Sequence, residues 1–437
     1  MPILDELYTD IASAIREKEP SEGDIKASDF PDRITGLRTK NNISSYPLLI
    51  HCVKGATITA TQGDTVISKV MGGGGVETLW LPESGIWNVV AQKGSYTSPI
   101  TEIELSGDVT LKEKLIDLIP NAVEPLTTAR RAIAGASIGY YAIFAGGYSP
   151  EIDETFAYDS LLTKVDTPLL SDKRAYIMSA SNPSYAVFAG GILYDCVANV
   201  EGYDSNLTKK AGTNLRSARR WGGSTGVGDV AIFGGGTLSG YPLTATSNVD
   251  SYNSNMTRSV GSLSSVRCVL DFVNPATSIG DYGLIGCGWI SSSNTVDTLD
   301  AFTETLTRKA APVLSAKSSQ TSACSSTNYA MFQISTGLTV YNANLTKSNG
   351  PRLSCSGNSR IGVSLNGNGI FFGGNGSEDQ KLMAELIDPN LTKKVLSNMT
   401  TGGTELSAAT TGSYAIIAGG CVNAKPQTTV DVYGIEP

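Results

Sequence analysis

The stretch Tyr185-Ala186-Val187-Phe188-Ala189-Gly190-Gly191 recurs in varied form from residue 141 to near the end of the chain. Close copies begin at Tyr141, Val230 and Tyr414, and weaker ones at Tyr282, Tyr329 and Asn368. The starting points lie 44, 45, 52, 47, 39 and 46 residues apart. Such steps are typical of β-propeller repeats and exceed the roughly 20–30 residues of a solenoid rung. The seven copies therefore predict a propeller.

Composition favours the same mainly β class. Of the 437 residues, 47 are glycine and only 17% are charged, which suits short strands joined by tight turns. The net charge of −8 provides no basic surface for phosphates, so we expect neither nucleic acid nor an anionic membrane as partner. The sequence has no run of 18 apolar residues and no signal-peptide pattern. We therefore expect no membrane insertion and synthesis in a cytoplasm.

The inventory of reactive residues argues against an enzyme. The only histidine, His51, precedes the repeats, which excludes a His-dependent triad or a His-ligated metal in the propeller. The seven cysteines are scattered without a C-x-x-C pair and are interpreted as buried small apolar residues. We expect no metal and no cofactor. A carboxylate pair able to hydrolyse glycosides remains an open alternative, because the separation of two carboxylates is not readable from sequence.

The first 45 residues differ from the rest of the chain. They predict two short amphipathic helices, one on the stripe of Leu4, Leu7, Ile11 and Ile15 and a second that carries Phe30, Ile34 and Leu37. Helices this short are marginal alone, so residues 1–45 are interpreted as an attachment and oligomerisation segment, with a trimer favoured.

The same segment carries a family resemblance. Its pattern, with Leu7, Ile11-Ala12, Ala14-Ile15-Arg16, Lys18, Ile25, Asp29-Phe30, Ile34 and Leu37, resembles the N-terminal segment of tail and fibre proteins of phages that infect Gram-positive bacteria. The resemblance implies that residues 1–45 bind other virion or tail subunits. It also implies a location in the virion tail or fibre.

Residues 46–110 alternate with the strand period and contain turn signals at Gly63-Asp64, at residues 72–75 and at Ser84-Gly85. They predict a small β-sandwich. The stretch Gly85-Ile86-Trp87-Asn88-Val89 resembles a strand of small carbohydrate-module-like sandwiches, which also occur as spacers in phage tail proteins. A spacer is favoured over a binding module.

Each repeat after residue 110 divides into four strands. In the second repeat these are 174–180, 185–189, 200–204 and 207–210. The glycine pair that closes strand two, the Tyr-Asp that closes strand three, and a basic residue that opens strand one resemble the kelch repeat. The basic residues are Arg130, Arg174, Arg219, Arg267 and Lys317. The resemblance implies a seven-bladed kelch-like β-propeller over residues 111–437.

The turn between strands three and four is nearly constant, as in Asp204-Ser205-Asn206-Leu207-Thr208-Lys209. An Asp or Asn in first place and an Asn in third place suit a tight turn that tolerates a left-handed residue. The last repeat ends after strand three, so we predict that residues 119–123 supply its missing strand and close the ring.

Divergent 2–3 loops lie opposite these constant turns, and such variation is expected of a binding face. Aromatic side chains there could stack on sugar rings while nearby carboxylates accept hydrogen bonds from hydroxyls. The candidate residues in these loops are Tyr148, Glu151, Asp153, Tyr194, Asp195, Tyr241 and Trp289, and Trp221 lies beside a 4–1 loop on the same face.

Together these patterns predict a phage or phage-like tail protein for host attachment. Its propeller would bind a bacterial cell-surface glycan or protein without catalysis, and assembly into a homo-oligomer would add avidity. Two alternatives stay open: a structural adaptor or decoration that binds other virion proteins, and a kelch protein-interaction module.

Overall fold

A computed structural model describes residues 46–51, 56–71, 76–93, 96–97, 101–105, 112–115, 123–238, 243–269, 273–291, 294–355 and 359–434. The chain divides into two compact units, Met1–Ala122 and Val123–Pro437. The predicted helical segment 1–45 lies outside the described residues.

The described part of the first unit contains two sheets that each bury one face, as in a two-layer β-sandwich. In the five-stranded sheet Ile58, Trp87 and Val89 are buried, and in the three-stranded sheet Leu48 and Leu79 are. The strands of the larger sheet are β2 (Thr57–Gln62), β3 (Thr65–Val70), β5 (Gly85–Lys93), β6 (Tyr96–Thr97) and β7 (Thr101–Leu105). The smaller sheet consists of β1 (Tyr46–His51), β4 (Val76–Leu81) and β8 (Lys112–Leu115).

Strand β8 corrects one predicted boundary. It pairs in parallel with β1, so residues 112–115 complete a sheet of the first unit instead of opening the propeller at residue 111. The division between the units falls later, after Ala122.

In the described part of Val123–Pro437, seven antiparallel sheets follow one another along the chain. Sheet one contains β9 (Ala134–Ile138), β10 (Tyr141–Ala145), β11 (Thr155–Tyr158) and β12 (Lys164–Asp166), and sheet two contains β13 (Met178–Ser181), β14 (Ala186–Ala189), β15 (Val200–Tyr203) and β16 (Lys209–Ala211). Sheet three contains β17 (Gly223–Val227), β18 (Val230–Gly234), β19 (Thr237–Leu238), β20 (Thr244–Tyr252) and β21 (Arg258–Arg267). Sheet four contains β22 (Ala276–Ile279), β23 (Tyr282–Ser291), β24 (Asn294–Phe302) and β25 (Arg308–Ala310).

The remaining sheets repeat this order. Sheet five contains β26 (Ser322–Ser325), β27 (Ala330–Ile334), β28 (Gly337–Tyr341) and β29 (Lys347–Asn349), and sheet six contains β30 (Ile361–Leu365), β31 (Asn368–Phe372), β32 (Ala384–Ile387) and β33 (Lys393–Val395). Sheet seven contains β34 (Ser407–Thr410), β35 (Tyr414–Ala418) and β38 (Val430–Gly434). Helix α3 (Glu378–Lys381) and the hairpin β36 (Cys421–Val422) and β37 (Lys425–Pro426) lie in 2–3 connections.

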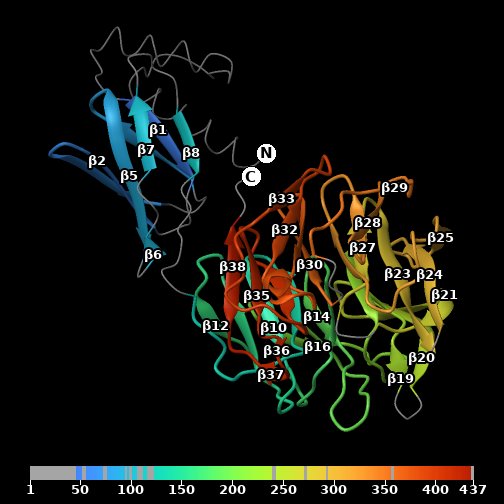
Figure 1. Ribbon diagram of the computed structural model, residues 1–437. Helices are drawn as coiled ribbons and strands as arrows, with labels where there is room; N and C mark the ends of the chain where they lie inside the picture. The colour runs from blue at the N-terminus through green and yellow to red at the C-terminus, as the bar shows by residue number, and fades with distance from the viewer. Residues whose placement is uncertain are drawn as a thin grey trace, which may run out of the picture. The chain divides into compact units, whose positions relative to one another are not determined.

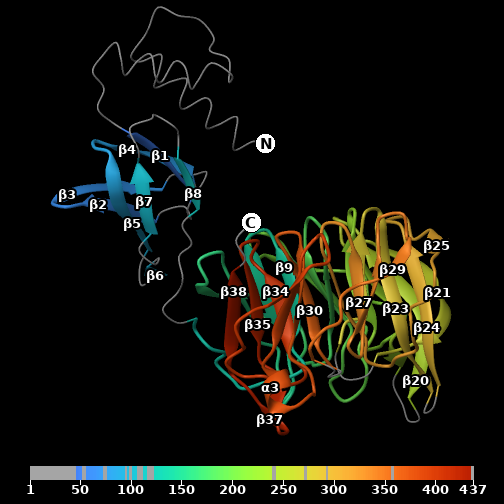
Figure 2. The ribbon, with the colours of Figure 1, turned by 45° about the horizontal axis from the view of Figure 1, so that its top comes forward.

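The first strands of the seven sheets contact one another in sequence order, and β34 of the last sheet contacts β9 of the first. Figures 1 and 2 show this propeller-like arrangement, with the red last sheet beside the teal first sheet. The first strands are rich in Ser, Ala and Gly, whose small side chains allow close approach. The last and first sheets are also joined by a hydrogen bond, in which the Thr410 amide N–H of β34 donates to Ser137 Oγ of β9 at 2.8 Å.

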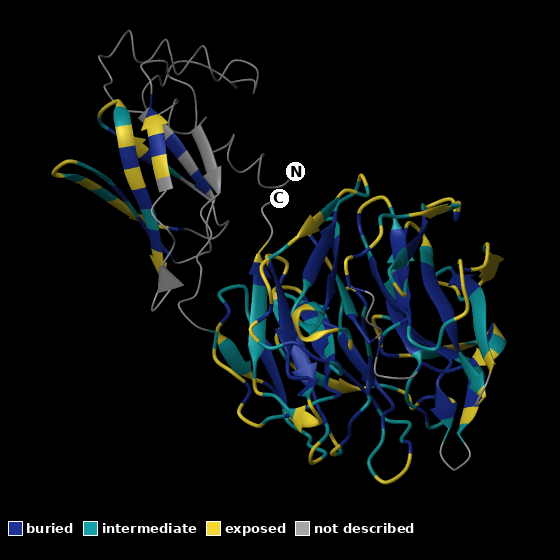
Figure 3. Ribbon diagram, in the orientation of Figure 1, coloured by how far each residue is buried: buried dark blue, intermediate teal, exposed yellow. Residues whose placement is uncertain are grey.

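The second strands are buried on both faces, as in Ala186–Ala189, because each sheet packs between two others. This explains the continuous apolar run of the repeated stretch. In sheets one, two, three and five, the third strand adds a buried aromatic ring that packs on the second-strand phenylalanine, as in Phe188 and Tyr203 with centroids 5.8 Å apart. Figure 3 shows the change from buried inner strands to exposed outer ones. The outer strands carry Lys or Arg, which discourages pairing with another chain.

A buried arginine holds the segment that leads into the first strand of five sheets. Arg174 has no exposed surface, and its Nη2 lies 2.6 Å from Glu201 Oε2 on β15. The same carboxylate accepts the amide N–H of Ser171 at 2.9 Å and pairs with Lys209 at 3.1 Å. The equivalent pairs are Arg219–Asp250, Arg267–Asp300 and Arg360–Glu385. In sheet one, Arg130 pairs instead with the partly exposed Glu154, which precedes β11.

These arginines differ from the predicted set in two ways. Lys317 is exposed and takes no part in such a pair, whereas Arg360, which the prediction missed, is buried and paired. The predicted first strand of sheet two also began too early. Arg174 precedes β13, which starts at Met178, because its backbone bridges neighbouring sheets.

In five sheets, a glycine pair after the second strand connects the sheet to the next one. The Gly191 amide N–H donates to the Arg219 carbonyl at 3.0 Å. Gly190 has a φ of +65°, and an added Cβ there would lie 2.3 Å from the same carbonyl oxygen. Only glycine fits this left-handed, close-packed position. In the last sheet, the Gly420 N–H donates to the Arg130 carbonyl of the first sheet at 3.1 Å.

The constant turn contains a left-handed residue, as its sequence predicted. Asp204 Oδ1 accepts the amide N–H groups of Asn206 and Thr208, as expected of an Asp in first place. The left-handed residue, however, is Leu207 with a φ of +60° and not the asparagine. Its side chain packs against the core between sheets one and two, which offsets the unfavourable backbone conformation. The fourth strand therefore begins only at Lys209.

The predicted closing strand at residues 119–123 falls almost wholly outside the described residues. Val123 is described and is not in a strand, and sheet seven has three strands among the described residues. Near its edge, the Leu126 amide N–H donates to the Thr428 carbonyl at 2.9 Å.

We predict that Arg174→Met lowers the free energy of unfolding by about 3–5 kcal/mol, because Glu201 loses its buried partner and keeps only the partly exposed Lys209 as a counter-charge. The double variant Arg174→Met/Glu201→Leu should recover part of this loss. Urea denaturation measures both. Lys317→Met is the control, because Lys317 lies in the matching segment of sheet five but is exposed and forms no such pair, and it should change stability by less than about 0.5 kcal/mol. A loss below about 1 kcal/mol in Arg174→Met would contradict the role assigned to the pair.

The same pairs predict a pH dependence of stability. Burial alone would raise the pKa of Glu201, but hydrogen bonds from Ser171 and the charge of Arg174 outweigh it and hold the pKa below its ordinary value of 4.5. The pKa of Glu385 is lowered in the same way beside Arg360. Their contribution is complete above the unfolded pKa and is lost as pH falls through the folded value. Urea midpoints should therefore drop below about pH 4.5, and less steeply in Glu201→Gln.

Candidate functional site

The segments that enter the first strands share an unusual backbone conformation. Two residues after the buried arginine, Ala132, Tyr176 and Trp221 have φ values of 52°, 56° and 62°. This left-handed region is uncommon for residues other than glycine and strained for bulky ones. Glu405 in sheet seven has a φ of 57°. Such outliers are found disproportionately at functional sites, which makes this end of the sheets a candidate site.

Backbone hydrogen bonds connect these left-handed residues from sheet to sheet. The Ala132 amide N–H donates to the Glu405 carbonyl at 3.2 Å, and the Tyr176 N–H donates to the Ala132 carbonyl at 3.2 Å. Farther along, the Val269 N–H donates to the Trp221 carbonyl at 2.9 Å. The strained conformation is therefore fixed by the neighbouring sheets, and it presents Tyr176 and Trp221 in neighbouring positions.

Five side chains form what we call the Arg–aromatic cluster: Arg131, Tyr148, Tyr176, Arg220 and Trp221. The rings of Tyr148 and Tyr176 stack with centroids 5.8 Å apart, and Tyr176 lies 5.9 Å from Trp221. The Arg131 guanidinium lies 5.0 Å from the centroid of Tyr148, and that of Arg220 lies 4.0 Å from Trp221. All five side chains are partly exposed. Rings and guanidinium groups arranged in this way suit the faces and hydroxyls of a polar ligand.

One carboxylate adjoins the cluster. Glu405 Oε1 lies 3.1 Å from Arg131 Nη1, and its charge raises the pKa of Arg131 although burial acts in the opposite direction. Burial and, to a lesser degree, the charge of Glu405 raise the pKa of Tyr176 to about 12. The Tyr176 hydroxyl is therefore protonated at neutral pH.

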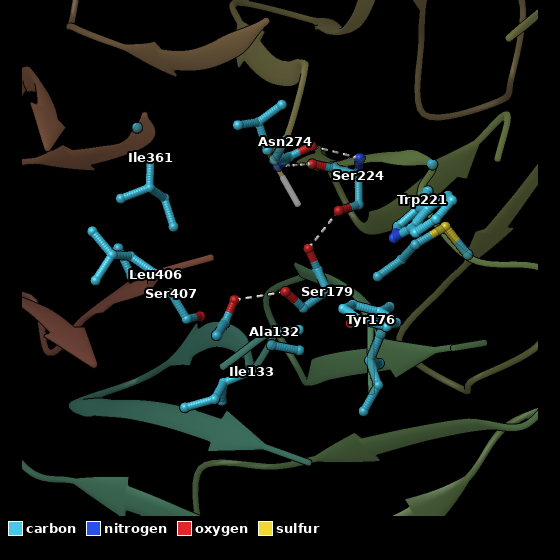
Figure 4. Close-up of a pocket in the computed structure, with 18 residues that line it drawn as sticks. Ala132, Ile133, Tyr176, Ser179, Trp221, Ser224, Asn274, Ile361, Leu406 and Ser407 are labelled. Carbon is cyan, nitrogen blue, oxygen red and sulfur yellow. Dashed lines mark hydrogen bonds between the residues drawn. The ribbon is translucent and has the colours of Figure 1, made fainter. Parts of the chain in front are cut away.

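A cavity of about 120 Å³ opens beside the cluster and is lined by the segments leading into the first strands of several sheets. Tyr176 and Trp221 form part of its wall, and Ser179, Ser224 and Asn274 form another part (Figure 4). The wall is organised by its own hydrogen bonds, since Asn274 Nδ2 donates to the Ser224 carbonyl at 2.7 Å and Ser224 Oγ to that of Ser179 at 2.7 Å. The cavity is smaller than the roughly 300–1,000 Å³ of typical small-molecule sites. It suits one group of a larger ligand.

The predicted site residues divide into three groups. Tyr148 and Trp221 belong to the Arg–aromatic cluster. Tyr194 is 93% exposed, and no ring or cation contact joins Tyr194 or Trp289 to the cluster within the described residues. Among the described residues, no ion pair joins Glu151, Asp153 or Asp195 to the cluster, while Tyr241 lies outside the described residues.

Sequence reasoning missed Arg131, Tyr176, Arg220 and Glu405. A signal for Tyr176 and Arg220 was present, because Arg174-Ala175-Tyr176 and Arg219-Arg220-Trp221 occupy equivalent positions of their repeats. The basic residue of each repeat was interpreted as the start of a strand, and the two residues that follow it were not predicted as site residues.

The described residues also limit the available chemistry. None of the residues that line the cavity within that part of the chain is Asp, Glu or His. No group of three or more His, Cys, Asp or Glu there could hold a metal ion. Six cysteines are buried free thiols, as predicted, and Cys52 is not among the described residues. No described helix is long and apolar enough to cross a membrane.

Comparisons with known proteins assign no family. No family model and no curated protein matches the chain. Among solved structures that match is that of YjhT, at 12% identity and a TM-score of 0.49, covering 63% of this chain and 99% of that chain. A likeness of this degree assigns neither a family nor a function.

We predict that Trp221→Gly is more stable than Trp221→Ala by about 1 kcal/mol, because glycine adopts the left-handed conformation without penalty. Both variants lose the same ring contacts, so their difference in urea denaturation isolates the backbone. The reverse order is expected at Ser179 in β13, where glycine should be less stable than alanine by about 0.5–1 kcal/mol. If Trp221→Ala is as stable as Trp221→Gly or more stable, the left-handed backbone at position 221 is not strained.

Proposed function

We propose that residues 123–434 form a closed, seven-bladed kelch-like propeller. The proposal is supported by the contact of β34 with β9, by the Gly420–Arg130 hydrogen bond, and by the repeated glycine pair and buried arginine. In this proposal the fourth strand of sheet seven comes from the N-terminal side, near residues 119–123. Closure removes the edge that an open array would expose.

The function that this geometry supports best is binding, without catalysis, of a bacterial cell-surface receptor, with a glycan as the favoured class. The observation that carries it is the Arg–aromatic cluster beside a small cavity lined by hydroxyl and amide groups. Aromatic rings bind the apolar faces of sugars, and guanidinium and hydroxyl groups bind their polar edges. The two predicted aromatic residues in the cluster, Tyr148 and Trp221, make it the centre of the proposed site.

The proposed setting is the tail or fibre of a phage-like virion. Residues 1–45 would bind other tail subunits and assemble the chain into a homo-oligomer, with a trimer favoured, and residues 46–115 would act as a spacer. Several weak sites that engage one surface together gain avidity. This setting rests on the resemblance of the N-terminal pattern to phage tail proteins.

A virion adaptor is the competing function and would require a contiguous apolar docking surface. The exposed large apolar side chains of the described propeller residues are instead spread over several sheets and connections: Tyr140, Leu169, Tyr194, Val260, Val266, Val313 and Val395. This distribution favours receptor binding over the adaptor.

We predict that full-length protein binds saturably to purified cell-wall glycans of at least one Gram-positive strain. Tyr148→Ala should weaken binding about tenfold or more, since it removes a ring of the cluster. Tyr140→Ala is the matched control, because Tyr140 is 74% exposed in the β9–β10 turn at the other end of sheet one. Surface plasmon resonance measures both, with thermal melting as a check on folding.

Two results would argue against the proposal. One is the absence of binding to every wall glycan and to intact cells, which would leave the virion adaptor as the better explanation. The other is an equal loss of binding in Tyr140→Ala and Tyr148→Ala, which would place the site away from the cluster.

A further inference from the structure

Two arginines of the Arg–aromatic cluster occupy equivalent positions but differ in how their charges are balanced. Arg131 follows Arg130, and Arg220 follows Arg219, in the copies of the same segment that lead into sheets one and three. Arg131 pairs with Glu405 at 3.1 Å. Among the described residues, no carboxylate pairs with Arg220 and no hydrogen bond involves its side chain.

The rings beside Arg220 hold its guanidinium in place. The group lies 4.0 Å from the centroid of Trp221 and 5.7 Å from that of Tyr176. Its Nε is buried and has no partner among the described residues. A guanidinium is charged at every accessible pH, and stacking on an aromatic face leaves its N–H edge available for an acceptor. Immobilised in this way, Arg220 loses little entropy when it binds a ligand.

The charge of the ligand follows from this arrangement. A guanidinium edge matches a carboxylate or a phosphate through two parallel hydrogen bonds, and a neutral hydroxyl accepts only one. The five buried arginines of the sheets all have such a carboxylate partner, whereas Arg220 has none among the described residues.

We propose that Arg220 is an anion-recognition residue and that the receptor is an acidic glycan, whose carboxylate or phosphate binds the guanidinium while its sugar contacts Tyr176 and Trp221. This inference rests on the proposed glycan-binding function and specifies the substrate class of that site. The ligand is expected to carry a negative charge, and the experiment distinguishes a carboxylate from a phosphate as its source.

The test compares three oligosaccharides of matched length on full-length protein: a neutral one, one that bears uronic acid, and one that bears glycerol phosphate. We expect one or both acidic ligands to bind about tenfold or more tightly than the neutral one at low salt. The preference should shrink at high salt because the site is partly exposed. Quenching of tryptophan fluorescence and calorimetry provide independent readouts.

The variant Arg220→Met keeps an apolar stem against the rings and removes the charge. It should abolish the preference for acidic ligands, so that acidic and neutral oligosaccharides bind this variant with equal affinity. Arg220→Lys keeps the charge but loses the two parallel N–H donors of the guanidinium, so this variant should retain part of the preference. Arg131→Met is the matched control, and its smaller effect is expected because Glu405 already balances its charge.

Three results would overturn the inference. Equal binding of acidic and neutral ligands would leave the proposed glycan-binding function intact and remove the role of Arg220. Binding of no oligosaccharide, together with no binding to cells, would remove both. The third concerns Asp271, which lies outside the described residues. Urea denaturation of Arg220→Met, Asp271→Asn and the double variant measures the coupling between the two side chains. A coupling free energy above about 1 kcal/mol would identify Asp271 as the partner of Arg220.

Discussion

The structure of the repeat depends on an arginine that is buried together with a carboxylate from the third strand. A buried charge is tolerated only when it is paired and fully hydrogen-bonded. Glu201 meets this requirement through Arg174, Ser171 and Lys209, which come from the segments before the first strand and after the third. One carboxylate thereby fixes how the chain enters and leaves a sheet. The arginine carbonyl accepts an N–H from the preceding glycine pair, so the same residue also sets the contact between sheets.

Two sheets that lack the arginine show that the pair behaves as a unit. In sheet five, Ser318 replaces the arginine and Thr339 replaces the carboxylate, and a hydroxyl contact of 2.6 Å between Ser315 and Thr339 remains. In sheet seven, Gly403 replaces the arginine, and the remaining Asp431 is partly exposed. Where the cation is missing, the anion is thus either absent or in contact with water. This behaviour is expected because removing a charged group from water costs free energy, and a buried cation or anion offsets that cost only when its partner is present.

The sequence predicted what depends on local pattern, and not what depends on contacts between repeats. The recurring run ending in Gly190-Gly191 indicated the mainly β class and the second strands correctly. The left-handed Leu207 was missed, since local propensity favours asparagine there and only burial between sheets reverses that preference. Tyr148 and Trp221 were predicted one by one, but the cluster that joins them through Tyr176 involves residues of three sheets. Such neighbours are known only once the order and packing of the sheets are known.

The same constraint explains why the candidate site lies at one end of the sheets. At the opposite end, the turn residue packs its side chain into the core, so the sequence there is nearly constant. At the end with the buried arginine, that side chain and the backbone of the glycine pair fix the position of the segment that leads into the first strand. The residues that follow the arginine are therefore free to vary. Because the chain is extended, burial of Arg219 directs Arg220 toward the surface. The interaction that holds the sheets together therefore also presents the cation that we infer to bind the ligand.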